Sequence, residues 1–339
     1  NHCIFAPTIK KPMLRQFLAG IFEITHGIML TLLFVGAVIT GLYVYQNRWD
    51  EVSELPVIRE ITGNYRQGLQ AIGGLSGLAL ERYEMGDFQA VGVDLSGQLP
   101  QLARAWNADD ILHKLRFSKS KMRQAEVFTQ YIDQHAESAL RDMLLHQVPA
   151  SVKLAQALLE SRAGQSGLAR NTNNHFGIKA RPNAQARRKI RERRYADLHN
   201  HEFIPVAPAI GAWRFHDDNT YDRFETYEAV GDSYARHTQL LTRACTFGHT
   251  GCYAWIWAAY PPGQEHDIRE AAAAFYHRSG IAAAEFFDGD TRVPYYAACA
   301  AGLKMAGYAT SPTYHKKITY LIETYELWRF DLALLKAFE

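Results

Sequence analysis

Glu160 is the residue whose neighbours in the sequence most suggest chemistry. It closes an apolar helical run over 152–159 and is followed at once by small, polar and glycine residues. At the C-terminal end of a packed helix, the helix dipole and partial burial both raise the pKa of a carboxyl group. A carboxyl that stays protonated at neutral pH is the general acid that cleavage of a glycosidic bond requires. The alternative is a helix-end glutamate that pairs with Arg162 or Arg170.

Two helices are predicted to position this acid. Apolar residues recur at helical intervals through SKSKMRQAEVFTQYIDQHAESALRDMLLHQ, residues 118–147. The segment VPASVKLAQALLES, residues 148–161, opens a second helix, with Pro149 near its start and Ser151 as a candidate N-cap. On that helix Gln156 lies one turn before the acid and on the same face.

The chain changes character after these helices. Residues 180–223 are polar, basic and rich in turn formers, with strand-like pieces such as EFIPV and AWRF. The stretch FHDDNTYDRF predicts a β-hairpin with Asp217, Asp218 and Asn219 at its tip. From Thr226 the pattern is mostly helical to the end of the sequence. The order of elements therefore predicts an α+β domain in which a small β lobe follows the helix that ends at the acid.

The first fifty residues predict a membrane anchor. Between Ile24 and Asn47 there is no Asp, Glu, Lys or Arg, and the apolar stretch IMLTLLFVGAVITGLYVY is long enough to cross a bilayer core of ~30 Å as a helix. Lys10, Lys11 and Arg15 precede it, which predicts a cytoplasmic N-terminus. No small-x-small cleavage site follows, which favours an uncleaved signal anchor over a signal peptide. The length of the stretch favours an anchor over a buried core helix.

This interpretation divides the chain into four parts. They are a cytoplasmic segment at 1–23, a single span of the inner (cytoplasmic) membrane at 24–47, a partly helical juxtamembrane spacer at 48–118, and a domain at 119–335 on the periplasmic or extracytoplasmic side. The formal net charge of +2 gives no global argument for a nucleic-acid partner.

The cysteines fit an exported domain. Cys245 and Cys252 flank the short loop TFGHTG, and their spacing permits a disulfide outside the cytoplasm without requiring one. Cys299 lies in an alanine-rich helical stretch and is expected to be buried, while Cys3 is expected in the cytoplasm. None of the cysteine spacings matches a zinc site.

The segment VPASVKLAQALLESRAGQSGLARNTNNHFGIK, residues 148–179, resembles the signature of the glucosaminidase family, glycoside hydrolase family 73. Members of that family include flagellar peptidoglycan hydrolases and bacterial autolysins. The pattern runs from a helix ending in Gln-x-x-x-Glu-Ser, through a Gly-x-Ser turn, to Asn-x-Phe-Gly-Ile-Lys. The matching residues here are Gln156, Glu160, Ser161, Gly164, Ser166, Asn174, Phe176, Gly177, Ile178 and Lys179.

Two later segments extend the resemblance over residues 125–332. RFETYEAVGDSYARHTQLLTR is similar to the helix start that follows the β lobe in the family, although Ala229 replaces the usual first serine. The closing helices also match, except that Ser311 stands where an aspartate is more usual. Residues 245–292 resemble an insertion relative to simpler members. The matching positions in these segments are Phe224, Tyr227, Ser233, Gly307, Tyr308, Ala309, Thr310, Pro312 and Tyr314.

The resemblance implies a lysozyme-like α+β fold that cleaves peptidoglycan between N-acetylglucosamine and N-acetylmuramic acid. It assigns the general-acid role to Glu160 and implies that Tyr308 positions the sugar or stabilises the transition state. No metal or organic cofactor is implied. The positions assigned to substrate binding are Gln156, Ser166, Asn174, Phe176 and Tyr227, of which Asn174 and Phe176 shape the loop at the cleft floor.

A second acid is expected from the β lobe, because glycosidases usually employ two carboxylates. The resemblance implies Asp217 or Asp218 for this role, with nothing to choose between them, and Asp222 and Glu225 lie nearby. Asp residues also favour turns for local reasons. Substrate assistance by the N-acetyl group is an alternative that needs no second protein base.

Zinc chemistry has a weaker sequence basis. His199 and His201 form an H-x-H pair, followed by His216 and Asp217, and a zinc peptidase would use His and Asp ligands in this way. No helical HExxH accompanies them, so the pattern favours chance over a metal site.

Two further features have a structural and a functional interpretation. The basic run ARRKIRERR favours a solvated face over a grip on anionic wall polymer or lipid headgroups. The aromatic residues of YAWIWAAYPPG favour core or lid packing of the insertion over a sugar subsite. These aromatic residues are Trp255, Trp257 and Tyr260, and the basic run includes Arg187, Arg188, Lys189, Arg191, Arg193 and Arg194.

The sequence therefore predicts a membrane-anchored peptidoglycan N-acetylglucosaminidase with peptidoglycan glycan strands as substrate. Two rivals stay open. One is a lytic enzyme of the same fold that forms an anhydro-sugar and needs Glu160 alone, as acid and then as base. The other is a non-catalytic wall-binding or scaffold subunit among the proteins of an envelope complex.

Overall fold

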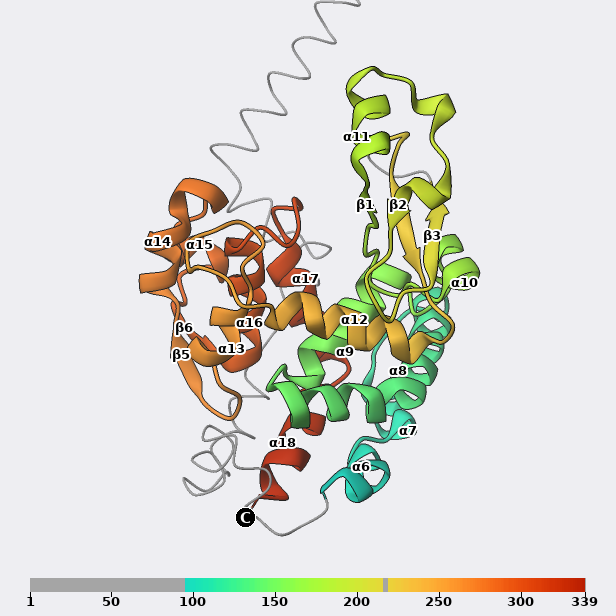
Figure 1. Ribbon diagram of the computed structural model, residues 1–339. Helices are drawn as coiled ribbons and strands as arrows, with labels where there is room; N and C mark the ends of the chain where they lie inside the picture. Colours follow the sequence, from blue (N-terminus) through green and yellow to red (C-terminus); the bar gives the residue numbers. More distant parts are fainter. Residues whose placement is uncertain (1–94, 216–218, 339) are drawn as a thin grey trace, which may run out of the picture. The chain divides into compact units, whose positions relative to one another are not determined.

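The computed structural model describes residues 95–215 and 219–338 (Figure 1). The predicted anchor at 24–47 lies outside these residues, so its membrane span stays a prediction. Within the described ranges, no helix is both long enough and apolar enough to cross a membrane. The described fold is mostly helical with small antiparallel strand pairs, which is the α+β class that the sequence predicts.

The two helices predicted around Glu160 form as expected. Helix α8 spans Lys119–His146, and a residue in the left-handed conformation, Gln147, ends it. Helix α9 spans Ala150–Ser161 and follows Pro149, whose fixed φ suits a helix start. Almost every residue of α9 is buried, because α8, α17 and α18 pack around it. This rigid, enclosed helix fixes the position of whatever stands at its end.

Ser151 does not cap α9 as the sequence analysis expected. Its backbone N–H and its hydroxyl both donate to the carboxylate of Asp331 in the C-terminal helix α18 (Trp328–Lys336). Tyr295 donates to the same carboxylate. Burial raises the pKa of Asp331 to about 6, and these hydrogen bonds oppose that rise. A distant carboxylate thus satisfies an N–H at the start of α9 that a local side chain would otherwise bind.

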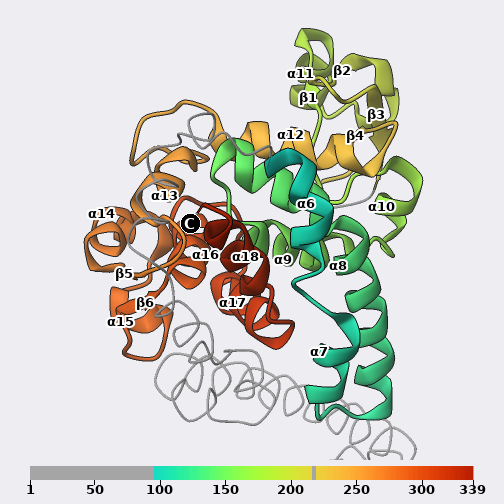
Figure 2. The ribbon, with the colours of Figure 1, turned by 90° about the horizontal axis from the view of Figure 1, so that it is seen from below.

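The folded domain begins earlier than residue 119. Helices α6 (Leu95–Ala103) and α7 (Ala108–Lys114) lie along α8 (Figure 2), in the segment that the sequence assigned to a partly helical spacer. Their apolar residues belong to the main core, and the indole of Trp106 donates to the carbonyl of Tyr325 at 2.6 Å. The hydrophobic effect therefore holds these helices on the domain.

The β lobe lies between α9 and α12 in sequence. The predicted hairpin is present: β3 pairs with β4 in antiparallel register, with Trp213 opposite Phe224. The basic run does not form a coil but a short helix, α11, whose side chains are mostly exposed. The elements of the lobe are α10 (Gly167–Thr172), β1 (Arg181–Pro182), α11 (Ala184–Arg191), η1 (Tyr195–Asp197), η2 (Asn200–Glu202), β2 (Phe203–Ile204), β3 (Gly211–Arg214) and β4 (Arg223–Thr226).

The rest of the described chain is mainly helical, as predicted. Helix α12 runs between the β lobe on one side and α13–α15 with β5 and β6 on the other (Figures 1 and 2). The last helices complete the main core around α9. The elements are α12 (Val230–Thr242), α13 (Ala254–Ala259), β5 (Glu265–Asp267), α14 (Arg269–Ser279), α15 (Ala283–Phe286), β6 (Arg292–Pro294), α16 (Tyr295–Met305), α17 (Tyr314–Thr324) and α18.

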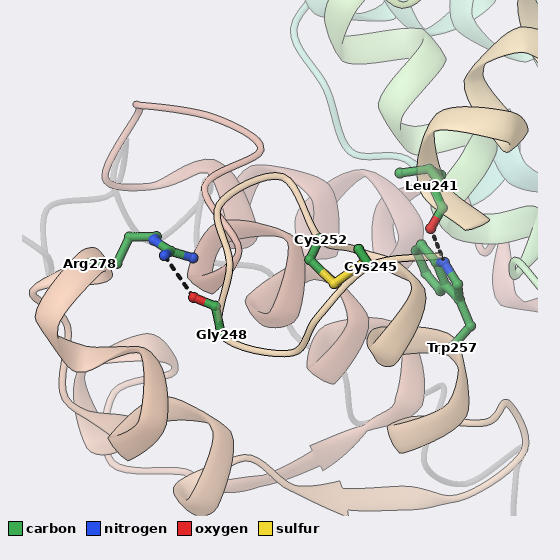
Figure 3. The surroundings of a disulfide bond; sticks show 6 residues. All are labelled: Leu241, Cys245, Gly248, Cys252, Trp257 and Arg278. Atoms are coloured by element: carbon green, nitrogen blue, oxygen red, sulfur yellow. Dashed lines mark hydrogen bonds between the residues drawn. A yellow bond between two sulfur atoms is a disulfide. The ribbon is translucent and has the colours of Figure 1, made fainter. Parts of the chain in front are cut away.

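The insertion at 245–292 begins with a loop closed by a disulfide (Figure 3). Cys245 and Cys252 are bonded to each other, whereas Cys299 is a free, buried thiol. Arg278 of α14 donates to the carbonyl of Gly248 in the loop, at 2.8 Å. The loop also donates a backbone hydrogen bond from Gly251 to Ala306, just before the turn that presents Tyr308.

Candidate active site

The turn after Glu160 ends α9 abruptly. Arg162, Ala163 and Gly164 all have positive φ, and the first two are non-glycine residues in the left-handed region. Ser161 supports the turn, because its hydroxyl donates to the carbonyl of Ala157 and accepts from the N–H of Gly164. Strained backbone of this kind persists only where the surroundings hold it, and it concentrates at functional sites. Glu160 therefore lies in the last turn of α9, directly before Ser161 and this strained turn.

Glu160 itself is exposed. The sequence analysis expected partial burial of this side chain, and that expectation is wrong: Glu160 is exposed although the next residue, Ser161, is buried. Its position at the C-terminal end of α9 is as predicted, and the negative end of the helix dipole acts on it there.

Two tyrosines from the C-terminal part of the chain interact electrostatically with Glu160. The rings of Tyr308 and Tyr314 stack with centroids 5.5 Å apart. Burial, followed by negative neighbours that include Glu160, raises the pKa of both phenols well above its usual value. Gly307 makes this approach possible, because its φ of +82° turns the chain sharply after α16. An acid and two phenols that keep their protons therefore share one site.

Gln156 holds Tyr314 by a hydrogen bond. Its side chain is fully buried one turn before Glu160, and its Nε2 donates to the hydroxyl of Tyr314 at 3.0 Å. Among the described residues its Oε1 has no hydrogen-bond partner. The sequence predicted a substrate-binding role for Gln156. In the structure its amide contacts a tyrosine of the site, and a direct contact with substrate stays a prediction.

His237 of α12 supports the first tyrosine. Its Nε2 lies 2.9 Å from the hydroxyl of Tyr308, and its ring stacks on Phe176 at a centroid distance of 3.9 Å. Phe176 is buried and also meets the ring of Tyr234 edge to face. Phe176, which the sequence assigned to the cleft floor, thus packs against the ring of His237, and His237 in turn contacts the hydroxyl of Tyr308.

Asn174 and Ser166 build the loop between α9 and the β lobe. The Asn174 amide donates to the carbonyls of Ile178 and Glu225 and accepts from the N–H of Ile178, so it fixes the loop by backbone contacts. Ser166 caps α10 by accepting from the N–H of Ala169. Both residues fix the local backbone, while the cleft-floor role of Asn174 and contact of either residue with substrate stay predictions.

A buried ion pair joins the β lobe to α12. Glu225 forms an ion pair with Arg236, whose Nε lies 3.0 Å from Oε2 and whose Nη2 donates to Oε1 at 3.4 Å, and it accepts from the hydroxyl of Tyr227 at 2.7 Å. Burial and the charge of Glu225 raise the pKa of Tyr227. Tyr227 is 3% exposed, and its hydroxyl is bound to Glu225. Its assignment to substrate binding stays a prediction.

The described acids of the hairpin are already paired. Asp222 forms an ion pair with Lys179 at 2.9 Å, and Glu225 is bound as above. The residues expected to supply the second acid, Asp217 and Asp218, lie outside the described residues, so their role stays a prediction.

The other sequence features lie away from Glu160. His199 and His201 are exposed and stack on each other at 5.4 Å, and no cluster of three or more metal-binding side chains occurs in the described ranges. Trp257 donates to the carbonyl of Leu241 and is buried (Figure 3), while Trp255 stacks on Phe275. The aromatic residues of the insertion are thus packing residues, as favoured.

Sequence reasoning missed three residues near Tyr308. Lys153 is fully buried in α9, His237 contacts the Tyr308 hydroxyl, and the Tyr253 ring meets the Tyr308 ring at 5.5 Å. A lysine inside the apolar run of α9 was the one available signal, because an ammonium buried in a packed helix needs partners. The partners themselves are contributed by α8 and α12.

A cavity of about 400 Å³ lies elsewhere, beside α13 and the approach to β5. Trp257 and His266 are among the residues that line it, and none of its lining residues belongs to the group around Glu160.

Comparison with known proteins identifies a family. The model of the glucosaminidase family, described as mannosyl-glycoprotein endo-β-N-acetylglucosaminidase, matches residues 136–327. The exo-glucosaminidase LytG of Bacillus subtilis (strain 168) is 25% identical over 209 residues, which cover 61% of this chain and 54% of that protein. The chain thus spans about half the length of this curated relative.

Two solved structures show weak similarity. The catalytic domain of the autolysin Auto from Listeria monocytogenes has a TM-score of 0.34 and 19% identity, covering 66% of this chain and 94% of that domain. An N-acetylmuramoyl-L-alanine amidase from Staphylococcus aureus has a TM-score of 0.33 and 20% identity, covering 61% and 43%. The family match, by contrast, spans more than half of the chain and includes Glu160, Tyr308 and Tyr314. The chain belongs to the glucosaminidase family of glycoside hydrolases.

Proposed function

We propose that the protein hydrolyses peptidoglycan at the glycosidic bond between N-acetylglucosamine and N-acetylmuramic acid, with Glu160 as general acid. The observation that carries this proposal is the grouping of Glu160 with Tyr308 and Tyr314 at the exposed end of α9. Membership of the glucosaminidase family supports a glycosidic substrate. The name of the relative LytG, an exo-glucosaminidase, points to the same chemistry.

In this mechanism the Glu160 carboxyl gives its proton to the glycosidic oxygen as the bond to the anomeric carbon breaks. Water then adds to the anomeric carbon and gives its proton to a base, which completes hydrolysis. Glu160 regains a proton from solvent through its exposed side. Tyr308 is half-buried beside the acid, so its hydroxyl is placed to orient the sugar or to stabilise the developing charge.

The base is the less defined partner. Asp217 or Asp218 takes this role in the proposal, because the nearby Asp222 and Glu225 are held in ion pairs inside the protein. Paired carboxylates of this kind have hydrogen-bond donors that compete with an attacking water. Variants Asp217→Asn and Asp218→Asn separate the two candidates: the true base loses most of the activity and the other loses little.

The proposal includes the setting of the enzyme. Residues 24–47 anchor the chain in the inner membrane, and the domain acts on glycan strands on the extracytoplasmic side, alone or with proteins of an envelope complex. Fractionation of cells that express the full chain tests this. Recovery in the membrane fraction that is lost when 24–47 is replaced by a polar segment is the expected result, and an equally membrane-bound variant would contradict it.

Product analysis tests the reaction. The full chain is incubated with purified peptidoglycan, and the soluble fragments are identified by mass spectrometry. Reducing-end N-acetylglucosamine is the expected product. Anhydro ends, lighter by one water, would instead assign a lytic reaction, and intact wall with bound protein would assign a binding role.

The size of the fragments distinguishes internal from terminal cleavage. An endo-acting enzyme, which we propose, releases oligosaccharides of mixed length early in the digestion. Release of single terminal sugars at constant strand length would show exo action, as the name of the relative LytG describes for that protein.

A further inference from the structure

Lys153 is a charged residue on a helix, α9, whose other side chains are mostly apolar and buried. Its side chain is fully buried on α9, two turns before Glu160. An unpaired ammonium there would cost several kcal/mol of stability. A methionine or leucine would fill the same space without that cost. We therefore expect the positive charge of Lys153 to have a specific role.

The ammonium of Lys153 has three acceptors for its three protons. These acceptors are Asp142 Oδ2 at 3.2 Å, Thr238 Oγ1 at 2.5 Å and His237 Nδ1 at 3.3 Å. Thr238 in turn donates to the same oxygen of Asp142 at 2.7 Å. One face of the ammonium also meets the Phe176 ring, at 5.6 Å from its centroid. Burial lowers the pKa of Lys153, and the charge of Asp142 opposes that change.

This arrangement dictates the tautomer of His237. An ammonium donates hydrogen bonds and accepts none, so the His237 Nδ1 that faces it carries no proton. Burial and the neighbouring cations lower the pKa of His237, so the ring is neutral. A neutral ring without a proton on Nδ1 carries it on Nε2. That nitrogen lies 2.9 Å from the hydroxyl of Tyr308.

We propose that Lys153 acts through His237 as a positioning residue that sets the direction of the hydrogen bond at Tyr308. His237 donates to the Tyr308 oxygen, so the single proton of Tyr308 is directed away from the histidine. It can then be donated to an acceptor oxygen of the Glu160 carboxyl group or to a sugar oxygen. With the opposite tautomer, the Tyr308 hydroxyl would donate its proton to His237 Nε2. Toward Glu160 and the sugar, Tyr308 could then only accept a hydrogen bond. This inference rests on the proposed function for its catalytic part.

Nuclear magnetic resonance tests the tautomer without any reference to activity. The full chain is labelled with ¹⁵N at histidine, and two-bond ¹H–¹⁵N spectra near pH 7 report which ring nitrogen carries the proton. The His237 signals are identified by their loss in His237→Gln. A protonated Nε2 and a bare Nδ1 are expected, and a protonated Nδ1 would overturn the proposal.

Removal of the ammonium tests the first step. In Lys153→Met the donor to Nδ1 is absent, so the second tautomer of His237 becomes populated and kcat falls about 10-fold with KM changed less than about 2-fold. Because the variant leaves Asp142 buried without its cation, the double variant Asp142→Asn/Lys153→Met is measured beside it. The double variant removes both charges and is expected to show the same kinetic change.

A control for the loss of an ion pair is Lys114→Met, although the Lys114 side chain is 52% exposed. Lys114 forms an ion pair of 2.7 Å with Glu326, which is buried, and neither residue contacts Tyr308. Loss of this ion pair is expected to lower stability without changing kcat. If either Lys153 variant folds and keeps the wild-type kcat, the positioning role is overturned.

Substitution of His237 tests the second step by rescue. The Nε2 amide of glutamine can donate from nearly the same point as Nε2 of histidine, whereas leucine fills the space without a donor. His237→Gln is expected to keep kcat within about 3-fold, and His237→Leu to lose about 10-fold at similar KM. Equal losses in both would show that the ring matters only for packing on Phe176.

The two proposals fail in different ways. If the wild-type chain cleaves no peptidoglycan but His237 has the expected tautomer, the proposed function is wrong and the hydrogen-bond order stands. If the wild type cleaves but the tautomer is reversed, the proposed function stands and the role of Lys153 is wrong.

Discussion

Two carboxylates in this domain each stand near tyrosines, and their surroundings differ sharply. Glu225 in the β lobe is completely buried and accepts from Arg236 and Tyr227. Glu160 is exposed at the end of α9, and its tyrosine neighbours are held by other side chains, Gln156 and His237. The first acid is stabilised as an anion by a cation and serves the fold. The second keeps a face open to a substrate, which is what proton transfer requires.

The largest expected effect separates the two acids by activity. Glu160→Gln removes the transferable proton while keeping the shape of the side chain, so peptidoglycan cleavage is expected to fall about 10²- to 10⁴-fold. Thermal unfolding of the variant is expected to match the wild type, because exposed side chains contribute little to stability. A variant that retained full activity would remove Glu160 from the mechanism.

The second prediction is a loss of stability with activity retained, the reverse of the result expected for Glu160→Gln. Glu225→Gln leaves the Arg236 guanidinium buried without its carboxylate, so the free energy of unfolding is expected to fall by about 3–5 kcal/mol. Denaturant titration measures it. If the folded fraction of this variant cleaved peptidoglycan as slowly as Glu160→Gln, Glu225 would have a catalytic role and the contrast would collapse.

A third acid, Glu323, sharpens the comparison because it is buried and forms no ion pair with any of the residues at 95–215 and 219–338. Burial, and then the charge of Glu326, raises its pKa to about 9. A raised carboxyl pKa gives stability that is full below about pH 4.5 and is lost as pH rises through about 9. Glu323→Gln is therefore expected to be more stable than the wild type at pH 8 by about 1–3 kcal/mol.

Unfolding curves measured across this pH window check the sign. The advantage of Glu323→Gln should shrink toward zero as the pH falls below about 4.5, where the wild-type carboxyl becomes protonated in both states. An advantage that does not depend on pH would show that the effect comes from packing. The Tyr296 hydroxyl, which donates to Glu323, can donate equally to a glutamine at position 323, so loss of this hydrogen bond does not enter the comparison.

The smallest expected effect concerns the two kinds of tyrosine. Tyr308→Phe removes a hydroxyl beside Glu160, and we expect kcat to fall about 10-fold with little change in stability. Tyr227→Phe removes a hydroxyl that donates to the buried Glu225, so about 1 kcal/mol of stability should be lost with kcat unchanged. Activity and chemical denaturation of the two variants, measured together, show whether the roles are exchanged.

Local patterns predicted the elements well where the cause is local. The helical periodicity of 118–147 gave α8, and turn-forming residues between two strand-like pieces gave the hairpin of β3 and β4. The candidate cap at Ser151 does not form, and the helices within the predicted spacer, α6 and α7, pack on the domain. In both cases the deciding contact is distant: Asp331 binds Ser151, and Tyr325 binds the indole of Trp106.

By itself, the sequence determined that an acid ends a buried helix, that a small lobe follows, and that the chain resembles glucosaminidases. Each of these depends on side-chain type and spacing within a few turns of the chain. Only the tertiary structure decided which acids are paired, that Glu160 is exposed, and that Lys153 and His237 stand behind Tyr308. The physical reason is that burial and hydrogen-bond partners come from segments about 70 or more residues apart, and folding alone brings them together.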